Sequence, residues 1–156
     1  MYRKIETPPT PIEKFELPFE GKLVEDNRWV IMANLIPWSE FEDEYAEQFT
    51  IEMGAPAKSF RTAIGALIIK ERLGLSDRET VEQIRENPYL QYFIGLNKYS
   101  NEAPFEASML VHFRQRIDMG LVNRMNRSMV KNSREEESEE ATEKKLLAVE
   151  KEEKKQ

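Results

Sequence analysis

The side chains best suited to bind a charged ligand are arginine, lysine and glutamine residues between positions 109 and 131. Five arginine and lysine residues in this segment accompany a single carboxylate, that of Asp118. Arginine and glutamine present paired hydrogen-bonding groups that match guanine and adenine edges, and lysine and arginine also bind phosphates. The segment is therefore a modest basic patch that could contact a nucleic acid.

Groups that could catalyse a reaction do not converge anywhere in the sequence. The chain has no cysteine and a single histidine, His112, which excludes a zinc finger, a thiolate metal site and an imidazole cluster. It also lacks a glycine-rich phosphate loop and a GxSxG motif. The carboxylates of residues 40–47 fan around a predicted helix, so we interpret them as a solvated face. We expect no enzymatic activity and no cofactor.

The net charge of −6 argues against nucleic-acid binding, but the charge is unevenly distributed. Residues 1–57 carry 5 basic and 12 acidic side chains, whereas residues 58–133 carry 12 basic and 8 acidic ones. Residues 134–156 are again acidic, with 6 basic and 9 acidic side chains. A surface for a polyanion would therefore lie in the middle segment.

The elements that would position these side chains are all helices, because apolar residues recur at helical spacing and no strand pattern is present. We expect a compact all-α domain of about six to seven helices over residues 25–133. An extended proline-containing arm, residues 1–24, precedes it, and a Glu/Lys-rich tail, residues 134–156, follows it as a disordered segment or a solvated helix. The expected helices are 26–36, 39–49, 59–73, 76–86, 89–94, 107–118 and one that starts at 121.

A tight turn is expected between the third and fourth helices. Gly74 would end the third helix in the left-handed conformation, and Ser76 with Glu79 has the spacing of a capping box that starts the fourth. This connection predicts a helix-turn-helix-like unit, although Lys70 stands where repressor-type motifs have a small residue. Gly65 would let a neighbouring element approach the third helix closely. A plain helical interaction module stays open as an alternative.

The second helix is expected to begin with another capping box. Ser39 and Glu42 have the required spacing, and Phe41, Tyr45 and Phe49 would form the apolar stripe of this helix.

No segment of the sequence indicates a membrane protein. The N-terminal residues lack the apolar run of a signal peptide, and no stretch approaches the roughly 20 apolar residues of a membrane span. We expect a cytoplasmic, nucleoid-associated protein with no membrane partner. The tail has few apolar residues with which to dock on the domain. An alternative stays open in which the acidic tail folds back over the basic helices and mimics phosphate.

Three stretches of the sequence carry a recognisable family pattern. In order between Phe19 and Ile117 they are NRWVIMANLIPWSEFEDEYAEQF, GAPAKSFRTAIGALIIKERLGLSDRETVEQIRENPYLQYFIGL and FEASMLVHFRQRI. They resemble the InsH-type N-terminal domain of bacterial insertion-sequence transposases. This resemblance implies recognition of an element's terminal inverted repeats. It leaves strand cleavage to a ribonuclease H-like domain, in which three acidic residues hold two divalent metal ions. The end of the chain, EKKLLAVEKEEKKQ, looks like the spacer before that domain, so we expect a truncated transposase without the catalytic domain.

Ten side chains are candidates for DNA contact on this interpretation. They are Arg78, Arg85, Ser108, His112, Arg114, Gln115, Arg116, Arg124, Arg127 and Lys131. Those on the helix at 107–118 would read bases, and the last three would bind phosphates. Each could instead be a solvated surface group, and His112 could be a packing residue beside Phe113.

The sequence leaves two alternatives to DNA binding open. The chain could be a helical oligomerisation or adaptor module that pairs with itself or inhibits a full-length transposase, or it could be an inert remnant. Double-stranded DNA at transposon ends is the partner that the resemblance favours.

Overall fold

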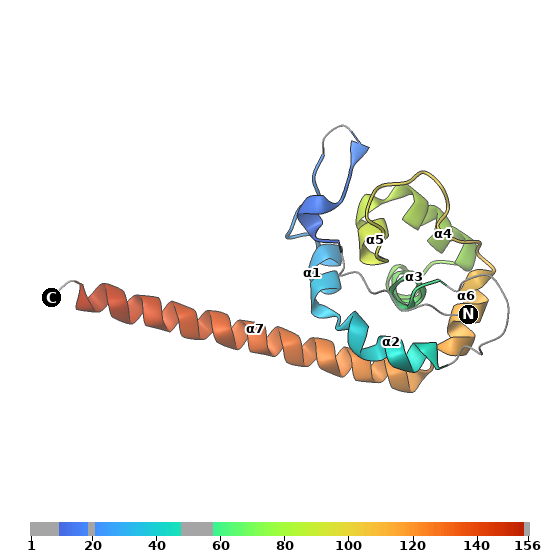
Figure 1. Cartoon of the computed structure of the whole chain (residues 1–156). Helices are drawn as coiled ribbons and strands as arrows, with labels where there is room; N and C mark the ends of the chain where they lie inside the picture. The colour runs from blue at the N-terminus through green and yellow to red at the C-terminus, as the bar shows by residue number, and fades with distance from the viewer. Residues whose placement is uncertain (1–9, 19–20, 48–57, 155–156) are drawn as a thin grey trace.

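The structure, a computed structural model, describes residues 10–18, 21–47 and 58–154. A helical body is joined to one long helix that extends away from it (Figure 1). Within the described ranges, strand-like pairing is limited to an isolated bridge between Glu16 and Lys98. The expected all-α fold is confirmed. The helices are α1 (Arg28–Leu35), α2 (Trp38–Ala46), α3 (Phe60–Leu73), α4 (Asp77–Glu86), α5 (Pro88–Phe93), α6 (Met109–Arg116) and α7 (Met119–Glu153), preceded by the 3-10 turn η1 (Ile12–Lys14).

Helix α3 lies at the centre of the body, where Figure 1 views it end-on. It contacts α2, α4 and α6, and its buried residues lie on most of its circumference, as the apolar pattern predicts. Gly65 permits a close approach by the segment after α5, because a Cβ atom at this position would lie 3.1 Å from Ile94 Cγ2. The expected role of this glycine is therefore confirmed.

Helices α1 and α2 are separated by Pro37, which ends the first helix and begins the second. Asn27 caps α1 by accepting a hydrogen bond from the Trp29 amide at 2.9 Å. The expected cap of α2 by Ser39 is wrong, because α2 begins at Trp38 with Pro37 in the cap position. The predicted stripe is confirmed at Phe41 and Tyr45, which are buried.

The third residue of that stripe, Phe49, lies outside the described residues.

The turn between α3 and α4 follows the sequence prediction. Gly74 has the left-handed conformation, with φ +63°, and the Ser76 hydroxyl accepts from the Glu79 amide at 3.1 Å. Val81 and Ile84 of α4 are buried, with exposed fractions of 6% and 0%. Three residues, 74–76, therefore hold α3 and α4 close together.

Helix α5 and the loop that follows it are held by a buried amide. Gln91 is 1% exposed and donates to the carbonyls of Ile84 and Ser100 at 3.0 and 2.9 Å. Its carbonyl oxygen accepts from the Ser100 amide at 2.9 Å. These bonds fix the loop that leads toward α6.

The described part of the N-terminal arm belongs to the core. Phe15 and Leu23 are buried, and the Phe15 ring meets Tyr92 edge-on at 5.8 Å. Glu16 also exchanges backbone hydrogen bonds with the loop after α5, through Asn97 and Tyr99. Two apolar side chains thus anchor the described part of the arm to the helical body.

Helix α7 contains both the expected seventh helix and the tail, as one helix of 35 residues. Its first part packs on the body through the buried Leu121 and Met125, and Asn132 donates to the Leu35 carbonyl at 3.2 Å. From Arg134 to Lys154 every residue is exposed. Of the two states expected for the tail, the solvated helix is confirmed. The tail extends away from α6 and does not cover that helix (Figure 1).

Candidate nucleic-acid interface

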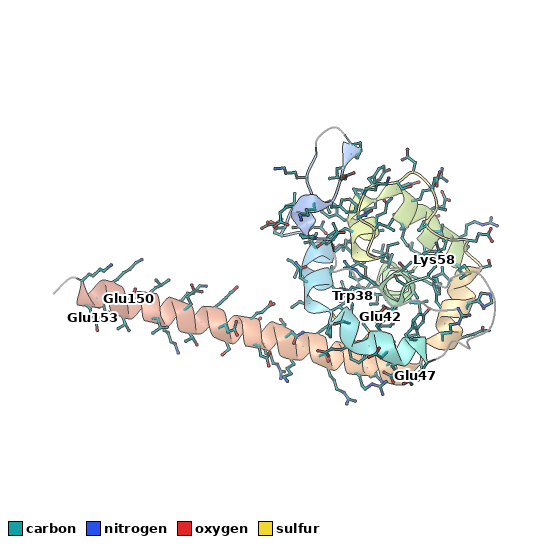
Figure 2. The ribbon with its side chains drawn as sticks, in the orientation of Figure 1. Trp38, Glu42, Glu47, Lys58, Glu150 and Glu153 are labelled. Carbon is teal, nitrogen blue, oxygen red and sulfur yellow. The ribbon has the colours of Figure 1, made fainter. Side chains whose placement is uncertain are left out.

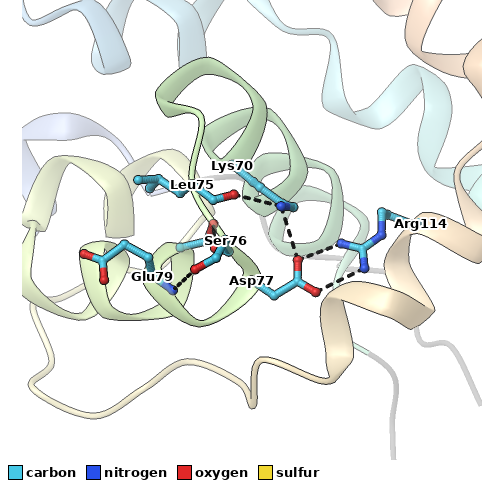
Figure 3. A network of polar contacts seen from close by, with 7 residues as sticks. Lys70, Leu75, Ser76, Asp77, Glu79 and Arg114 are labelled. Atoms are coloured by element: carbon cyan, nitrogen blue, oxygen red, sulfur yellow. Dashed lines mark hydrogen bonds and ion pairs between the residues drawn. The ribbon is translucent and has the colours of Figure 1, made fainter.

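The basic helix α6 is tied to the start of α4 by a paired ion bridge (Figure 3). Arg114 Nη1 and Nη2 donate to the two carboxylate oxygens of Asp77 at 2.8 and 3.1 Å. Lys70, near the end of α3, lies 3.5 Å from the same carboxylate and donates to the Leu75 carbonyl at 2.8 Å. One carboxylate thus connects α3, α4 and α6.

The electrostatics of this network favour the charged form of Asp77. The hydrogen bonds from Arg114 hold the pKa of the Asp77 carboxyl below its ordinary value, and the charge of Lys70 acts in the same direction. The same contact raises the pKa of Arg114. Asp77 is also the first residue of α4, where the helix dipole favours an anion.

The side of α6 that faces away from the core presents polar groups to solvent. Ser108, His112 and Gln115 are exposed, and their spacing of four and three residues places them on one face with Val111. Leu110 and Phe113, on the other side, are completely buried. Ser108 stands at the N-cap of α6 without a side-chain cap hydrogen bond.

Arg116, the last residue of α6, turns toward the body. It lies beside Tyr45 of α2, where its charge and a hydrogen bond oppose the effect of burial, which raises the pKa of the Tyr45 hydroxyl. The side chain of Arg116 is only partly exposed. It therefore joins α6 to α2.

The two candidates on α4 differ in their surroundings. Arg78, one residue after Asp77, is exposed and borders an open surface hollow with Phe105. Arg85 donates through Nε to the Asn101 carbonyl at 2.8 Å and lies 3.5 Å from Glu82. Arg85 therefore holds the loop before α6.

The candidates on α7 also divide into two kinds. Arg124 donates to a carboxylate oxygen of Glu44 on α2. Arg127 is exposed, and Lys131 is exposed at 3.9 Å from Glu135, one helical turn further along α7. Arg124 links two helices, whereas the other two cations face solvent.

The ten candidates thus form a group on α4 and α6, joined through Asp77, and a second group on α7. Residues 18–116, which contain the whole first group, match a family model described as a transposase domain (DUF772). The chain belongs to this transposase family. The resemblance to an insertion-sequence transposase domain is thereby confirmed.

A relative of this transposase domain comes from Rhizobium meliloti, where it is described as an uncharacterized protein, ORF8, in the nfe locus. The two sequences are 39% identical over 88 residues, which cover 56% of this chain and 42% of the relative. The chain thus spans less than half the length of the relative that it matches. No solved structure matches it.

The described part of the transposase-family chain contains no group of three or more histidine, aspartate or glutamate residues placed to hold a metal ion. In the same residues no helix combines the length and apolar content that a bilayer span requires.

The sequence pattern did not reveal Lys70 and Asp77 as partners of the transposase domain's basic helix. An aspartate directly after an N-cap serine usually serves the helix start alone, so the only signal was the acidic first turn of α4. The pattern also missed Arg61, which lies over the rings of Trp38 and Tyr92 and donates to the Phe93 carbonyl at 2.9 Å. Burial lowers the pKa of Arg61, and the contact with Tyr92 opposes that shift.

Proposed function

We propose that this transposase domain recognises double-stranded DNA at the ends of an insertion sequence, and that α6 is its reading helix. The observation that carries the proposal is the exposed face of α6, where Ser108, His112 and Gln115 stand together. The last turn of the helix is braced twice, by the Asp77–Arg114 bridge and by Arg116 beside Tyr45. A braced helix with a polar outer face suits insertion into the major groove, which is about 12 Å wide.

The chemistry of this face matches base edges. The Gln115 amide can donate to and accept from the adenine edge at the same time, and the imidazole of His112 can donate or accept one hydrogen bond. Arg78 lies on α4, the helix bridged to α6, and would contact a phosphate and not a base. Binding would then combine a base-reading face with backbone contacts.

The geometry assigns a positioning role to Arg114 within this proposal. Both terminal nitrogens of its guanidinium already donate to Asp77, so a bidentate contact with guanine would require that bridge to break. Arg124, paired with Glu44, holds α7 in the same manner. The base-reading role rests on His112 and Gln115.

Strand cleavage is assigned, by resemblance to the family, to a ribonuclease H-like domain outside the matched residues. The partners of the domain are then transposon-end DNA and the transposase molecules that assemble on it. This role would place the protein at the chromosome, in the cytoplasm.

Fluorescence anisotropy of the chain on two labelled duplexes tests this function. One duplex carries the inverted repeat that flanks the gene, and the other carries a scrambled version of it. Gln115→Ala should reduce the preference for the repeat by roughly 5- to 150-fold, which is the discrimination of one bidentate base contact. The matched control is Gln83→Ala on α4, whose amide donates to the Glu79 side chain at 3.1 Å.

The outcomes separate the candidate roles. Loss of preference in Gln115→Ala alone supports α6 as the reading helix, whereas loss in Gln83→Ala alone would assign reading to α4. Equal weak binding to both duplexes by the unmodified chain would refute sequence recognition and leave the adaptor role. Binding to the repeat should also weaken steeply with salt.

A further inference from the structure

Two opposite faces of α7 differ in charge between residues 127 and 145. An α-helix turns by about 100° per residue, so residues three, four and seven apart share one face. The residues from 119 to 153 form one unbroken helix, which allows the faces to be followed from the body into the exposed part. Figure 2 shows side chains extending from this part, Glu150 and Glu153 among them, with no other helix beside them.

One face carries four cations between residues 127 and 145. Arg127, Lys131 and Arg134 follow one another at spacings of four and three residues and are exposed. The same three side chains border one open hollow on the surface of α7, together with Asn126, Val130, Glu135 and Ser138. The face continues through residues 138 and 141 to Lys145, which is also exposed. We call these four cations the basic face of α7.

Between Arg127 and Lys145 the acidic residues lie elsewhere on the helix, and the basic face ends at Lys145, because Glu152 stands seven residues further along the same line. The carboxylates of Glu136, Glu140 and Glu143 continue the line of the buried Leu121 and Met125, on the opposite side of the helix. Glu135 lies at the edge of the basic face, 3.9 Å from Lys131. The net charge of the tail therefore conceals a cationic strip on its outer side.

We propose that the basic face of α7 is a docking surface for the phosphate backbone of duplex DNA, so that the tail forms part of the DNA interface. This inference rests on the proposed function and extends it to Arg134 and Lys145. From Arg127 to Lys145 the strip is about 27 Å long at a rise of about 1.5 Å per residue. That length is comparable to one turn of the DNA helix, about 34 Å, along which phosphates are continuously present.

Charge complementarity favours DNA over a second copy of the chain. A helix pair needs a continuous apolar seam, with apolar residues repeating every three to four positions. The basic face has no such seam, because its cations are separated by Ser138, Ala141 and Thr142, and a single exposed valine, Val130, lies at its edge. A polyanion with phosphates at regular spacing fits the strip better.

A pair of double variants tests this surface with matched charge. Arg134→Ala/Lys145→Ala removes two cations from the basic face. Lys144→Ala/Lys151→Ala removes two exposed cations that project from the side of the same helix. Alanine preserves helix formation, which circular dichroism checks in both variants. The measurement is the affinity of the full chain for the labelled inverted-repeat duplex over a salt series.

The expected result is a smaller salt dependence in the first variant only. Each phosphate contact contributes about 0.9 to the slope of log K against log salt, so loss of two contacts should reduce the slope by about 1.8. Equal slopes in the two variants, with the unmodified chain bound, would overturn this inference and leave the proposed function intact. Absence of any DNA binding by the unmodified chain would overturn both. A salt-sensitive dimer that only the first variant loses, seen by sedimentation without DNA, would assign the face to a second copy.

Discussion

Replacing Asp77 with asparagine removes the charge that connects α3, α4 and α6. The carboxylate accepts from both terminal nitrogens of Arg114, 37 positions away in the sequence, and lies 3.5 Å from Lys70. Asparagine keeps the size of the side chain but can hold only one of the two Arg114 bonds as an acceptor. The substitution therefore tests whether α6 is braced by this bridge.

The expected loss is about 1 to 2 kcal/mol of the free energy of unfolding. The side chains of Asp77 and Arg114 are 29% and 43% exposed. Because solvent screens the pair, it contributes at most about 1 kcal/mol even with its bidentate geometry. The helix dipole at the start of α4 adds about 0.3 to 1 kcal/mol in favour of an anion. A loss of this size lowers Tm by roughly 2 to 8 °C in a chain of this length.

The pH dependence follows from the lowered pKa of Asp77. A carboxyl whose pKa is lower in the folded than in the unfolded state stabilises the fold at pH values above its unfolded pKa, about 3.9. This contribution is lost as the pH falls through the folded-state value. The difference in stability between the parent chain and Asp77→Asn should therefore be constant near neutral pH and shrink in acid.

Urea unfolding at pH 7 of the parent, Asp77→Asn, Arg114→Gln and the double variant measures the pair directly. The coupling energy from this cycle should be about 0.5 to 1 kcal/mol. A coupling energy near zero at pH 7, or a loss in Asp77→Asn that grows toward acid, would refute the reasoning. The control is Glu86→Gln, an exposed charge change at the other end of α4, which should alter stability by less than about 0.5 kcal/mol.

Three further changes should have distinct effects on stability. Gly65→Ala should cost about 1 to 3 kcal/mol in urea unfolding, because the new methyl group would lie 3.1 Å from Ile94; a neutral result would mean that this segment can move aside. Gly74→Ala should cost about 1 to 2 kcal/mol, because φ is +63° with open space around the site; no change would show that the turn tolerates a different backbone. Deletion of residues 134–156 should lower the helical circular dichroism signal but leave Tm within about 2 °C, since the described residues of this segment are exposed; a large fall would reveal a stabilising contact.

Local sequence signals predicted most of the helices because their causes lie within a few residues. The left-handed glycine at 74 and the cap at Ser76 depend on backbone geometry and neighbouring amides, and both were confirmed. The exception was the start of α2. There the Trp38 side chain donates to the Ala33 carbonyl at 3.0 Å and packs against Phe93, so the helix begins before the predicted cap.

The pairing of charged side chains was decided only by the packing of helices. Arg114 and Asp77 are 37 positions apart, and Arg124 and Glu44 are 80 apart. Periodicity shows that each of these residues faces outward from its own helix, but it does not show which other helix lies beside that face. The candidate site could therefore be predicted as a set of cations on particular helices. Which of them hold the fold together depended on the tertiary arrangement.

The tail illustrates the same division. Its composition alone allowed either disorder or a solvated helix, because an isolated helix must bear the unfavourable cost of forming its first turn. In the structure the tail continues α7, whose first turns are fixed by Leu121 and Met125 in the core, so that nucleation is already complete. The order of charges along the tail was present in the sequence. The alignment of Arg127, Lys131, Arg134 and Lys145 on one face became a property of the molecule only because the packed body supplies the helix from which the tail extends.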